Sequence, residues 1–242
     1  YAQLEQRAAQ LQISNTELER FAYVASHDLQ EPLRMISSFL QLLEKKYQDT
    51  IDEKGRDYIR FAVDGSLRMK YLINDLLDYS RVSTRRQNLE QVNVEFIVKD
   101  VLQNLSLRIE EKKAVIKTSM LPVLPNADKT QMVQLFQNLI GNALKYSGHK
   151  QPRIEIEAVE KEEEWLFAIK DNGIGFDERF AEKIFVIFQR LHNRSEYSGT
   201  GIGLAICKKI IDRHGGKIYA ESVPGEGSRF WFTIKKHLVA EQ

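Results

Sequence analysis

Glycine and proline are distributed so unevenly along this chain that its two parts cannot share one architecture. Residues 1–86 contain one proline, Pro32, and two glycines, whereas the other four prolines and eleven glycines all follow residue 120. Helix interiors tolerate few residues of either kind, while turns between strands require them. The distribution predicts a helical domain over residues 1–86, a linker at 87–92 and a mixed domain over residues 93–238.

Apolar residues near the start of the chain follow a seven-residue repeat. The repeat consists of Leu4, Leu11, Leu18 and Ala25, with Ala8 and Ala22 at the intervening positions. Such a seam predicts a coiled-coil helix that pairs with another helix. We expect this helix to reach about Tyr47, and a second to run to about Arg86 from Thr50, which has capping-box spacing to Glu53. One hairpin cannot bury both apolar faces, so a homodimeric four-helix bundle is expected. Packing of these faces on the C-terminal domain is the alternative.

The second part of the chain groups its expected elements differently. We expect helices at 93–112, 128–145 and 203–214, strands at 115–118, 153–159, 164–170, 217–222 and 228–235, and a break at Pro122–Pro125. The run from Val223 to Gly227 has the glycines and proline of a turn between the last two strands. Strands and helices that are grouped, rather than strictly alternating, indicate an α+β two-layer sandwich.

Composition excludes several classes of protein. The formal net charge is only +1, which argues against a partner nucleic acid held by a basic surface. The single cysteine, Cys207, rules out an internal disulfide and fits a reducing compartment such as the cytoplasm. No apolar run approaches the roughly 18 residues of a membrane span. Because the chain begins at Tyr1 without a methionine, we expect it to be part of a longer protein.

A histidine lies on the outer face of the first expected helix. His27 is two residues past Ala25 and two before Leu29, a rotation of about 200° from each, so it should point to solvent. A neutral exposed imidazole is a competent nucleophile, and the neighbouring Asp28 can accept its ring N–H. Pro32 cannot donate to the carbonyl of Asp28 and should kink the helix. Taken alone, an exposed histidine is more often an ordinary surface residue.

Amides and a lysine share one face of the helix expected at 128–145. Asn138 and Asn142 are four residues apart, and Lys145 follows three residues later. Two amides and an ammonium suit a hydrated Mg²⁺ and phosphates. An ordinary polar helix face is the alternative for this segment taken alone.

Two glycine segments have patterns suited to a nucleotide. Asp171 to Phe176 follows a strand, where a carboxylate can accept from an exocyclic amine and Gly173 and Gly175 permit close approach of a flat ring. Gly199 to Leu204 opens a helix, where phosphates bind readily. This second segment lacks the Gly-Lys-Ser/Thr of a P-loop and the preceding strand of a Rossmann fingerprint. Between them, Arg190, His192 and Arg194 could reach phosphates from a mobile segment. For the segment from Asp171 to Phe176 taken alone, the alternative is an ordinary turn. For the basic residues between the two glycine segments, the alternative is a solvated loop.

The order and spacing of these segments resemble the sensor histidine kinases of two-component signalling. The similar motifs are a histidine box at 26–34, an asparagine box at 138–147, a first glycine box at 171–176, a phenylalanine box at 185–190 and a second glycine box at 199–204. The segments at 21–34 and 188–192 are most similar to the phytochrome-type subgroup.

The resemblance implies a fold, a reaction and a set of ligands. It implies a dimerisation and histidine-phosphotransfer hairpin, followed by an ATP-binding domain of the left-handed histidine-kinase, chaperone and gyrase type. It further implies that His27 attacks the γ-phosphate of ATP with Asp28 as general base, that Asn142 holds Mg²⁺, and that the phosphoryl group passes to an aspartate on a response-regulator receiver domain. The implied nucleotide-binding residues are Asn138, Asn142, Lys145, Tyr146, Asp171, Gly173, Gly175, Arg190, Gly199, Thr200, Gly201, Gly203 and Leu204, with a lid at about 189–198.

One position departs from the resemblance, and two other classes of protein compete with it. Glu31 stands four residues past His27, where many family members have Thr or Asn, so the resemblance implies kinase activity but does not extend to phosphatase activity. A chaperone, topoisomerase or mismatch-repair ATPase would lack the histidine helix. A non-enzymatic dimerisation module would lack an intact nucleotide site. The heptad repeat is expected to continue upstream into a sensory domain, and a hinge is expected near 85–90.

Overall fold

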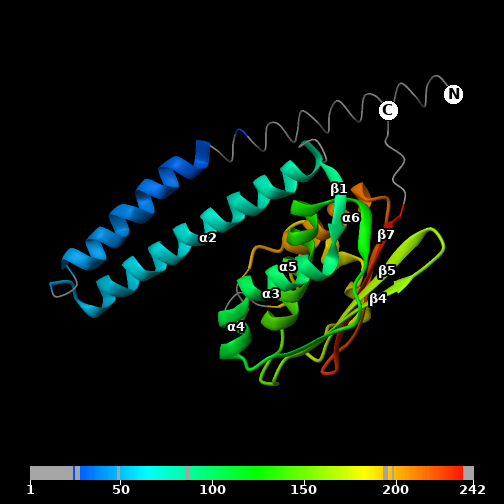
Figure 1. The fold of residues 1–242 in the computed structure, drawn as a ribbon. Helices are drawn as coiled ribbons and strands as arrows, with labels where there is room; N and C mark the ends of the chain where they lie inside the picture. The colour runs from blue at the N-terminus through cyan, green and yellow to red at the C-terminus, as the bar shows by residue number, and fades with distance from the viewer. Residues whose placement is uncertain are drawn as a thin grey trace. The chain divides into compact units, whose positions relative to one another are not determined.

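The computed structural model describes residues 24, 28–47, 50–84, 88–192, 196–197 and 199–236 (Figure 1). His27 and the six residues of the heptad repeat lie outside these ranges. The predictions about the coiled coil and about the exposure of His27 therefore stay predictions.

Two helices form the hairpin of the first part of the chain (Figure 1). Residues 28–47 are helical, and α2 spans Glu53–Thr84. Leu33 of the first helix and Leu77 of α2 are buried. Two polar contacts fix their register: Gln30 Nε2 donates to Asn74 Oδ1 over 2.7 Å, and Ser37 Oγ donates to Ser66 Oγ over 2.9 Å. The expected helical hairpin is confirmed.

The start of α2 differs from the expected capping box. Asp52 Oδ1 accepts the backbone N–H of Gly55 over 2.8 Å, so Asp52 caps the helix. The hydroxyl of Thr50 instead donates to the carbonyl of Tyr47, at the end of the preceding helix. The aspartate, two residues beyond Thr50, satisfies a free N–H of the first turn, which is why the helix starts later than the threonine predicts.

Many large apolar side chains of the hairpin remain exposed. They are Leu29, Met35, Ile36, Phe39, Leu42, Leu43, Tyr58, Phe61, Met69 and Tyr71. A hairpin with so much exposed apolar surface has more than one face to cover. This agrees with the argument that one hairpin cannot bury both of its apolar faces.

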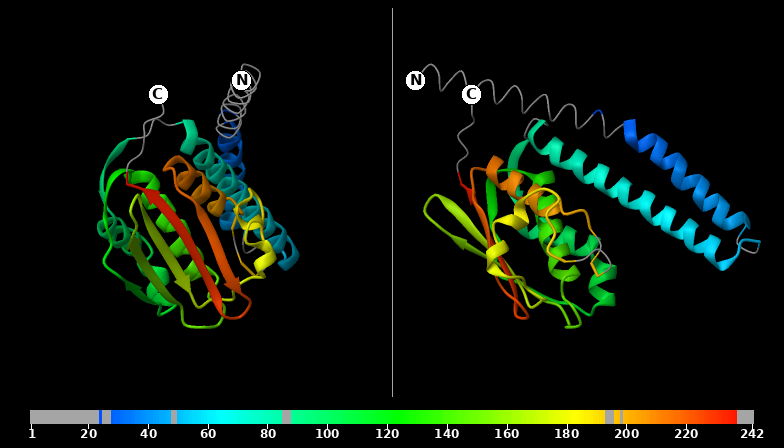
Figure 2. Two further views of the ribbon diagram at one scale, coloured as in Figure 1. Left: turned by 90° about the vertical axis from the view of Figure 1, so that its right-hand side faces the viewer. Right: turned by 180° about the vertical axis from the view of Figure 1, so that it is seen from behind.

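A five-stranded sheet forms the second part of the chain, in the order β2-β4-β5-β7-β6 (Figure 2). Its strands are β2 (Val115–Thr118), β4 (Arg153–Glu160), β5 (Glu164–Asp171), β6 (Ile218–Val223) and β7 (Gly227–Lys235). Strands β2 and β4 are parallel, and the other pairs are antiparallel. The sheet is thus mixed, with β5 and β7 at its centre.

Helices α3 (Val94–Asn104), α5 (Lys129–Lys145) and α6 (Gly203–Arg213) form the second layer of the sandwich (Figure 2). Three buried rings join the layers. Phe167 of β5 stacks on Phe232 of β7 with centroids 4.9 Å apart, and Phe136 of α5 meets both edge-on. Asp128 starts α5 by accepting the N–H of Gln131 over 3.0 Å. The expected α+β two-layer sandwich is confirmed.

One region of the sandwich differs from the sequence prediction. Strands β1 (Leu89–Asn93) and β3 (Val123–Asp128) form a small antiparallel ladder, where a linker and a break were expected. The register shifts between Glu90 and Val92, so Pro125 falls in the irregular stretch and need not donate to the ladder. The helix expected at 93–112 is divided at Leu105 into α3 and α4 (Ser106–Glu111).

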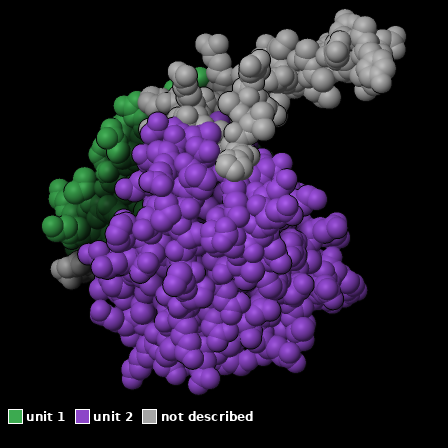
Figure 3. All heavy atoms as spheres, turned by 45° about the vertical axis from the view of Figure 1, so that its right-hand side comes forward, with its two compact units in different colours: residues 1–84 green, residues 85–242 purple. Residues whose placement is uncertain are grey.

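The described chain divides into two compact units, residues 1–84 and 85–242 (Figure 3). Residues 89–92, placed in a linker by the sequence analysis, belong to the second unit through β1. Short 3-10 helices at Glu178–Phe180 (η1) and Lys183–Phe185 (η2) connect β5 to α6. No helix in the described ranges has the length and apolar character that crossing a bilayer requires.

Candidate nucleotide-binding site

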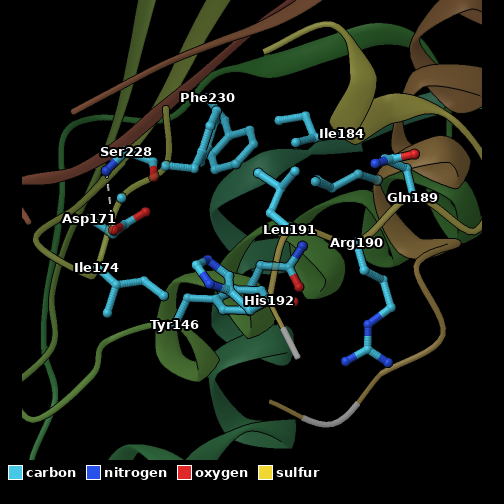
Figure 4. A pocket seen from close by; sticks show the side chains of 14 residues that line it. Tyr146, Asp171, Ile174, Ile184, Gln189, Arg190, Leu191, His192, Ser228 and Phe230 are labelled. Atoms are coloured by element: carbon cyan, nitrogen blue, oxygen red, sulfur yellow. Dashed lines mark hydrogen bonds between the residues drawn. The ribbon is translucent and has the colours of Figure 1, made fainter. Parts of the chain in front are cut away.

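A pocket in the second unit lies between the end of β5, the end of α5 and the segment that precedes α6 (Figure 4). Six of the residues predicted to bind nucleotide line it: Asn142, Tyr146, Asp171, Gly175, Arg190 and Leu204. Seven others do not: Asn138, Lys145, Gly173, Gly199, Thr200, Gly201 and Gly203. The fold thus brings the asparagine box, the first glycine box and the phenylalanine box to one cavity. Asp28 belongs to the other unit and is exposed.

Asp171 is the one buried carboxylate that lines the pocket. Its Oδ1 accepts the N–H of Gly173 over 2.8 Å and that of Ser228 over 3.3 Å; the second bond is drawn in Figure 4. Burial raises the pKa of Asp171 to about 6, and the two N–H donors oppose this rise. Above that pH the carboxyl is an anion at an apolar pocket, and it can only accept hydrogen bonds.

The raised pKa of Asp171 makes a testable prediction about stability. A carboxyl whose folded-state pKa lies above its usual 3.8 binds its proton more tightly in the folded state, so stability falls as the pH rises from about 4 to about 6. The full effect is about 3 kcal/mol at roughly 1.4 kcal/mol per unit. Asp171→Asn removes this penalty. Urea unfolding should show the variant gaining up to about 3 kcal/mol over wild type at pH 8, and little at pH 4. A constant difference across this pH range would contradict the assignment.

Gly175 lets the first glycine box pack against the hairpin between β6 and β7. Its φ is +61°, and a Cβ atom there would collide with the carbonyl oxygen of Val223. The neighbouring Ile174 accepts the N–H of Gly225 over 2.7 Å, which ties the same loop to the hairpin turn. The left-handed backbone and the close approach both require glycine.

Alanine at Gly175 should therefore destabilise the second unit by more than about 2 kcal/mol, from backbone strain and the collision together. Gly141, in the interior of α5 and outside the pocket lining, is the control: nothing lies within 4 Å of the Cβ it would gain. Gly141→Ala should raise the free energy of unfolding by about 0.5–1 kcal/mol. Denaturant unfolding of both variants checks the pair, and equal effects would refute the account of Gly175.

Asn138 connects two helices instead of lining the pocket. Its Nδ2 donates to the carbonyl of Gly203 over 3.3 Å, at the first residue of α6. A Cβ atom on Gly203 would lie 3.4 Å from Asn138 Oδ1, so the glycine permits this close contact. The asparagine box therefore places one amide, Asn142, in the pocket and the other at the start of α6.

The second glycine box lies beside two cationic side chains. Lys145 Nζ donates to Tyr146 Oη over 2.8 Å, and a Cβ atom on Gly199 would approach that Nζ to 2.6 Å. Arg190 lines the pocket, but its guanidinium donates to the carbonyls of Tyr197 and Gly199. Arg190 thus binds backbone carbonyls of the segment before α6. The sequence analysis predicted Arg190 only as a nucleotide ligand and did not include this contact.

Several lining residues were not predicted. They are Ile174, Phe176, Ile184, Gln189, Leu191, Ser228 and Phe230. His192, which was expected to reach phosphates, also lines the pocket. Ser228 and Phe230 alternate on β7, and Ser228 pairs directly with Asp171 in the antiparallel ladder. The hairpin turn was predicted from sequence, so the alternation of β7 could have identified these two residues. The unpredicted lining residues between η2 and α6 lie in a segment that does not alternate apolar and polar residues. No comparable pattern could therefore have identified them.

The residues that line the pocket fit an adenine nucleotide. Ile174, Ile184 and Phe230 supply apolar walls, and Asp171 supplies a buried acceptor for an exocyclic amine. No group of three His, Cys, Asp or Glu side chains within the described ranges could hold a metal. Magnesium usually keeps water and substrate phosphates as most of its ligands, so one amide, Asn142, fits such a role.

Two family models match this chain. The model described as His Kinase A (phospho-acceptor) domain matches residues 17–85. The model described as histidine kinase-, DNA gyrase B- and HSP90-like ATPase matches residues 127–238. The first match contains His27 and the hairpin, and the second contains the pocket.

Relatives of known name match nearly the whole chain. Phytochrome-like protein Cph1 of Synechocystis sp. is 51% identical over 232 residues, which are 96% of this chain and 31% of that protein. Cyanobacterial phytochrome A of Nostoc sp. is 52% identical over 232 residues, 96% of this chain and 30% of that protein. The chain therefore spans about a third of the length of the curated relatives it matches.

Solved structures of histidine kinases are similar to most of this chain. Full-length ShkA in complex with AMPPNP matches with a TM-score of 0.68 and 25% identity, covering 89% of this chain and 45% of that one. The histidine kinase ThkA in complex with the response regulator TrrA matches with a TM-score of 0.63 at 21% identity, covering 96% of this chain and 67% of that one. The second likeness shows the fold alone.

Proposed function

Because the chain belongs to the histidine kinase family, we propose that it is the catalytic region of a sensor histidine kinase that autophosphorylates His27 with Mg-ATP. The phosphoryl group then passes to an aspartate of a response-regulator receiver domain. The observation that supports this proposal most is the buried carboxyl of Asp171 in an apolar pocket beside Asn142. The proposed domains are a phosphotransfer hairpin, 1–86, and an ATP-binding domain, 93–238, to which β1 (Leu89–Asn93) adds a strand.

The pocket residues bind and orient the substrate. Asp171 accepts from the adenine amine, and Gly175 keeps the backbone close to the ring. Gly173 lies outside the pocket and donates its N–H to Asp171. Asn142 would bind the Mg²⁺ that neutralises phosphate charge. The second glycine box, Gly199 to Gly203, lies at the start of α6, where backbone N–H groups favour phosphate. Phosphoryl transfer needs such positioning and charge neutralisation more than covalent help from the protein.

The hairpin supplies the nucleophile. A neutral ring nitrogen of His27 attacks the γ-phosphorus, the bond to the β–γ bridging oxygen breaks, and ADP leaves. Asp28 follows His27 directly and accepts the proton from the other ring nitrogen, which keeps the attacking nitrogen nucleophilic. Because the phosphohistidine must meet two partners in turn, it has to be accessible on its helix.

The hairpin also carries the proposed assembly. Its exposed apolar faces suit a homodimeric four-helix bundle, and the heptad repeat upstream suits input from a sensory domain in a longer protein. We propose a cytoplasmic location from the single free cysteine, Cys207. Because Glu31 stands four residues past His27, where many family members have Thr or Asn, the proposal covers kinase activity and leaves out phosphatase activity.

Radiolabelled ATP tests the proposal directly. Asn142→Ala should reduce Mg²⁺-dependent labelling of the protein by at least about 100-fold, because the metal that neutralises the transferring phosphate loses its protein ligand. Gln137→Ala is the matched control, since Gln137 is exposed on the same helix and does not line the pocket. It should label like wild type. Unchanged labelling of Asn142→Ala would refute the metal role of Asn142.

A further inference from the structure

Three aromatic rings meet at the edge of the pocket. The ring of Tyr146 lies 5.8 Å from that of His192 and 5.0 Å from that of Tyr197, and the last two are 5.5 Å apart. Figure 4 shows Tyr146 and His192 side by side in the pocket wall. Tyr146 ends α5, whereas His192 and Tyr197 belong to the segment before α6. The cluster therefore joins two segments that are distant in sequence.

Tyr146, one of the three rings, also contacts the charged side chain of Lys145. Tyr146 Oη accepts from Lys145 Nζ over 2.8 Å, and that Nζ lies 4.4 Å from the centre of the Tyr146 ring. The ammonium is also beside Gly199, where a Cβ atom would approach it to 2.6 Å. Hence the tyrosine determines where the lysine charge lies relative to the second glycine box.

The backbone around the cluster is held independently of the rings. Tyr146 O accepts the N–H of Ile174 over 2.9 Å, and Phe188 N donates to Gly201 O over 3.0 Å. Arg190 donates to the carbonyl of Tyr197. A substitution in one ring therefore leaves these backbone bonds in place, and its effect reports on the ring contacts.

We propose that His192 and Tyr197 are positioning residues for the phosphate end of the nucleotide. Their rings hold the ring of Tyr146, and Tyr146 Oη in turn holds the Lys145 ammonium beside Gly199. This inference rests on the proposed function, because it assumes that ATP binds with its phosphates at the second glycine box. It assigns His192 a role through Lys145 rather than a direct contact with the base.

Three ligands that differ in their number of phosphates distinguish this role from a contribution to binding the base. Titration calorimetry with adenosine, ADP and ATP would be performed on the whole chain, as wild type, Tyr146→Phe and His192→Ala. Tyr146→Phe keeps the ring and removes the hydroxyl that holds Lys145. Both variants should weaken ATP binding about three- to tenfold more than they weaken adenosine binding, the range of one ordinary hydrogen bond or aromatic contact.

Two further variants make the test specific. His192→Phe retains a ring and should restore most of the ATP affinity that His192→Ala loses. In a Lys145→Gln background, His192→Ala should cause no further loss, because both changes remove the same interaction. Thermal unfolding without nucleotide serves as the check that each variant folds.

The outcomes are distinct. Equal losses for adenosine and ATP, or additive losses with Lys145→Gln, would overturn the positioning role. Unchanged ATP affinity in Tyr146→Phe and His192→Ala would overturn it as well. Wild type that binds none of the three ligands would instead contradict the proposed function itself.

Discussion

Asp171→Asn should weaken ATP binding by more than about 100-fold at pH 8, where the carboxyl is ionised. Asparagine has the same shape, and its single carbonyl oxygen can still accept from Gly173 and Ser228. Its amide N–H₂ then takes the place of the second carboxylate oxygen, so a donor meets the donor amine of adenine. A site that leaves such a buried polar group unpaired discriminates by several kcal/mol. Titration calorimetry measures the loss.

Asp177→Asn is the control for this variant. Asp177 lies in the same connection after β5, but it is outside the pocket, where its Oδ1 accepts the N–H of Arg179 at the start of η1. Asparagine can make the same bond, so ATP affinity should stay within about twofold of wild type. Sedimentation should show the same oligomeric state for both variants and wild type. Normal ATP affinity in Asp171→Asn would sink the assignment of the adenine acceptor.

The sandwich was predictable where periodicity and turn residues agree. Strand β4 alternates apolar and polar residues, β5 contains an unbroken apolar run from Trp165 to Ile169, and the glycines after Val223 specify the hairpin between β6 and β7. The β1–β3 ladder was not predictable, because two prolines near β3 normally argue against a strand. Only the pairing itself shows that Pro125 falls at a register shift.

The site residues that belong to short local motifs could be predicted from the sequence. Asp171, Gly175 and Asn142 stand in short motifs whose chemistry is local, and all three line the pocket. Phe230 lies 59 residues from Asp171 in sequence and reaches the pocket only through the pairing of β5 with β7. Arg190 was predicted as a ligand from its charge. Its hydrogen bonds to the carbonyls of Tyr197 and Gly199 could not be predicted, because they depend on the tertiary structure.

His27→Ala should abolish acid-labile labelling from radiolabelled ATP, a loss limited only by the detection of the assay. The reason is chemical, because alanine has no atom that can form a bond to phosphorus. ATP affinity should be unchanged, since the pocket lies wholly within residues 142–230. Label on the gel and calorimetry on the same samples measure the two quantities.

His149→Ala is the matched control, because His149 follows α5 and does not line the pocket. It should label like wild type, which separates the loss of one acceptor from a general effect of removing a histidine. Label that persists in His27→Ala would assign the acceptor to another residue. Wild type that binds ATP without becoming labelled would mean that the nucleotide site works while the histidine is not presented to it. In that case the sensory region, into which the heptad repeat before His27 is expected to continue, would be the element to restore.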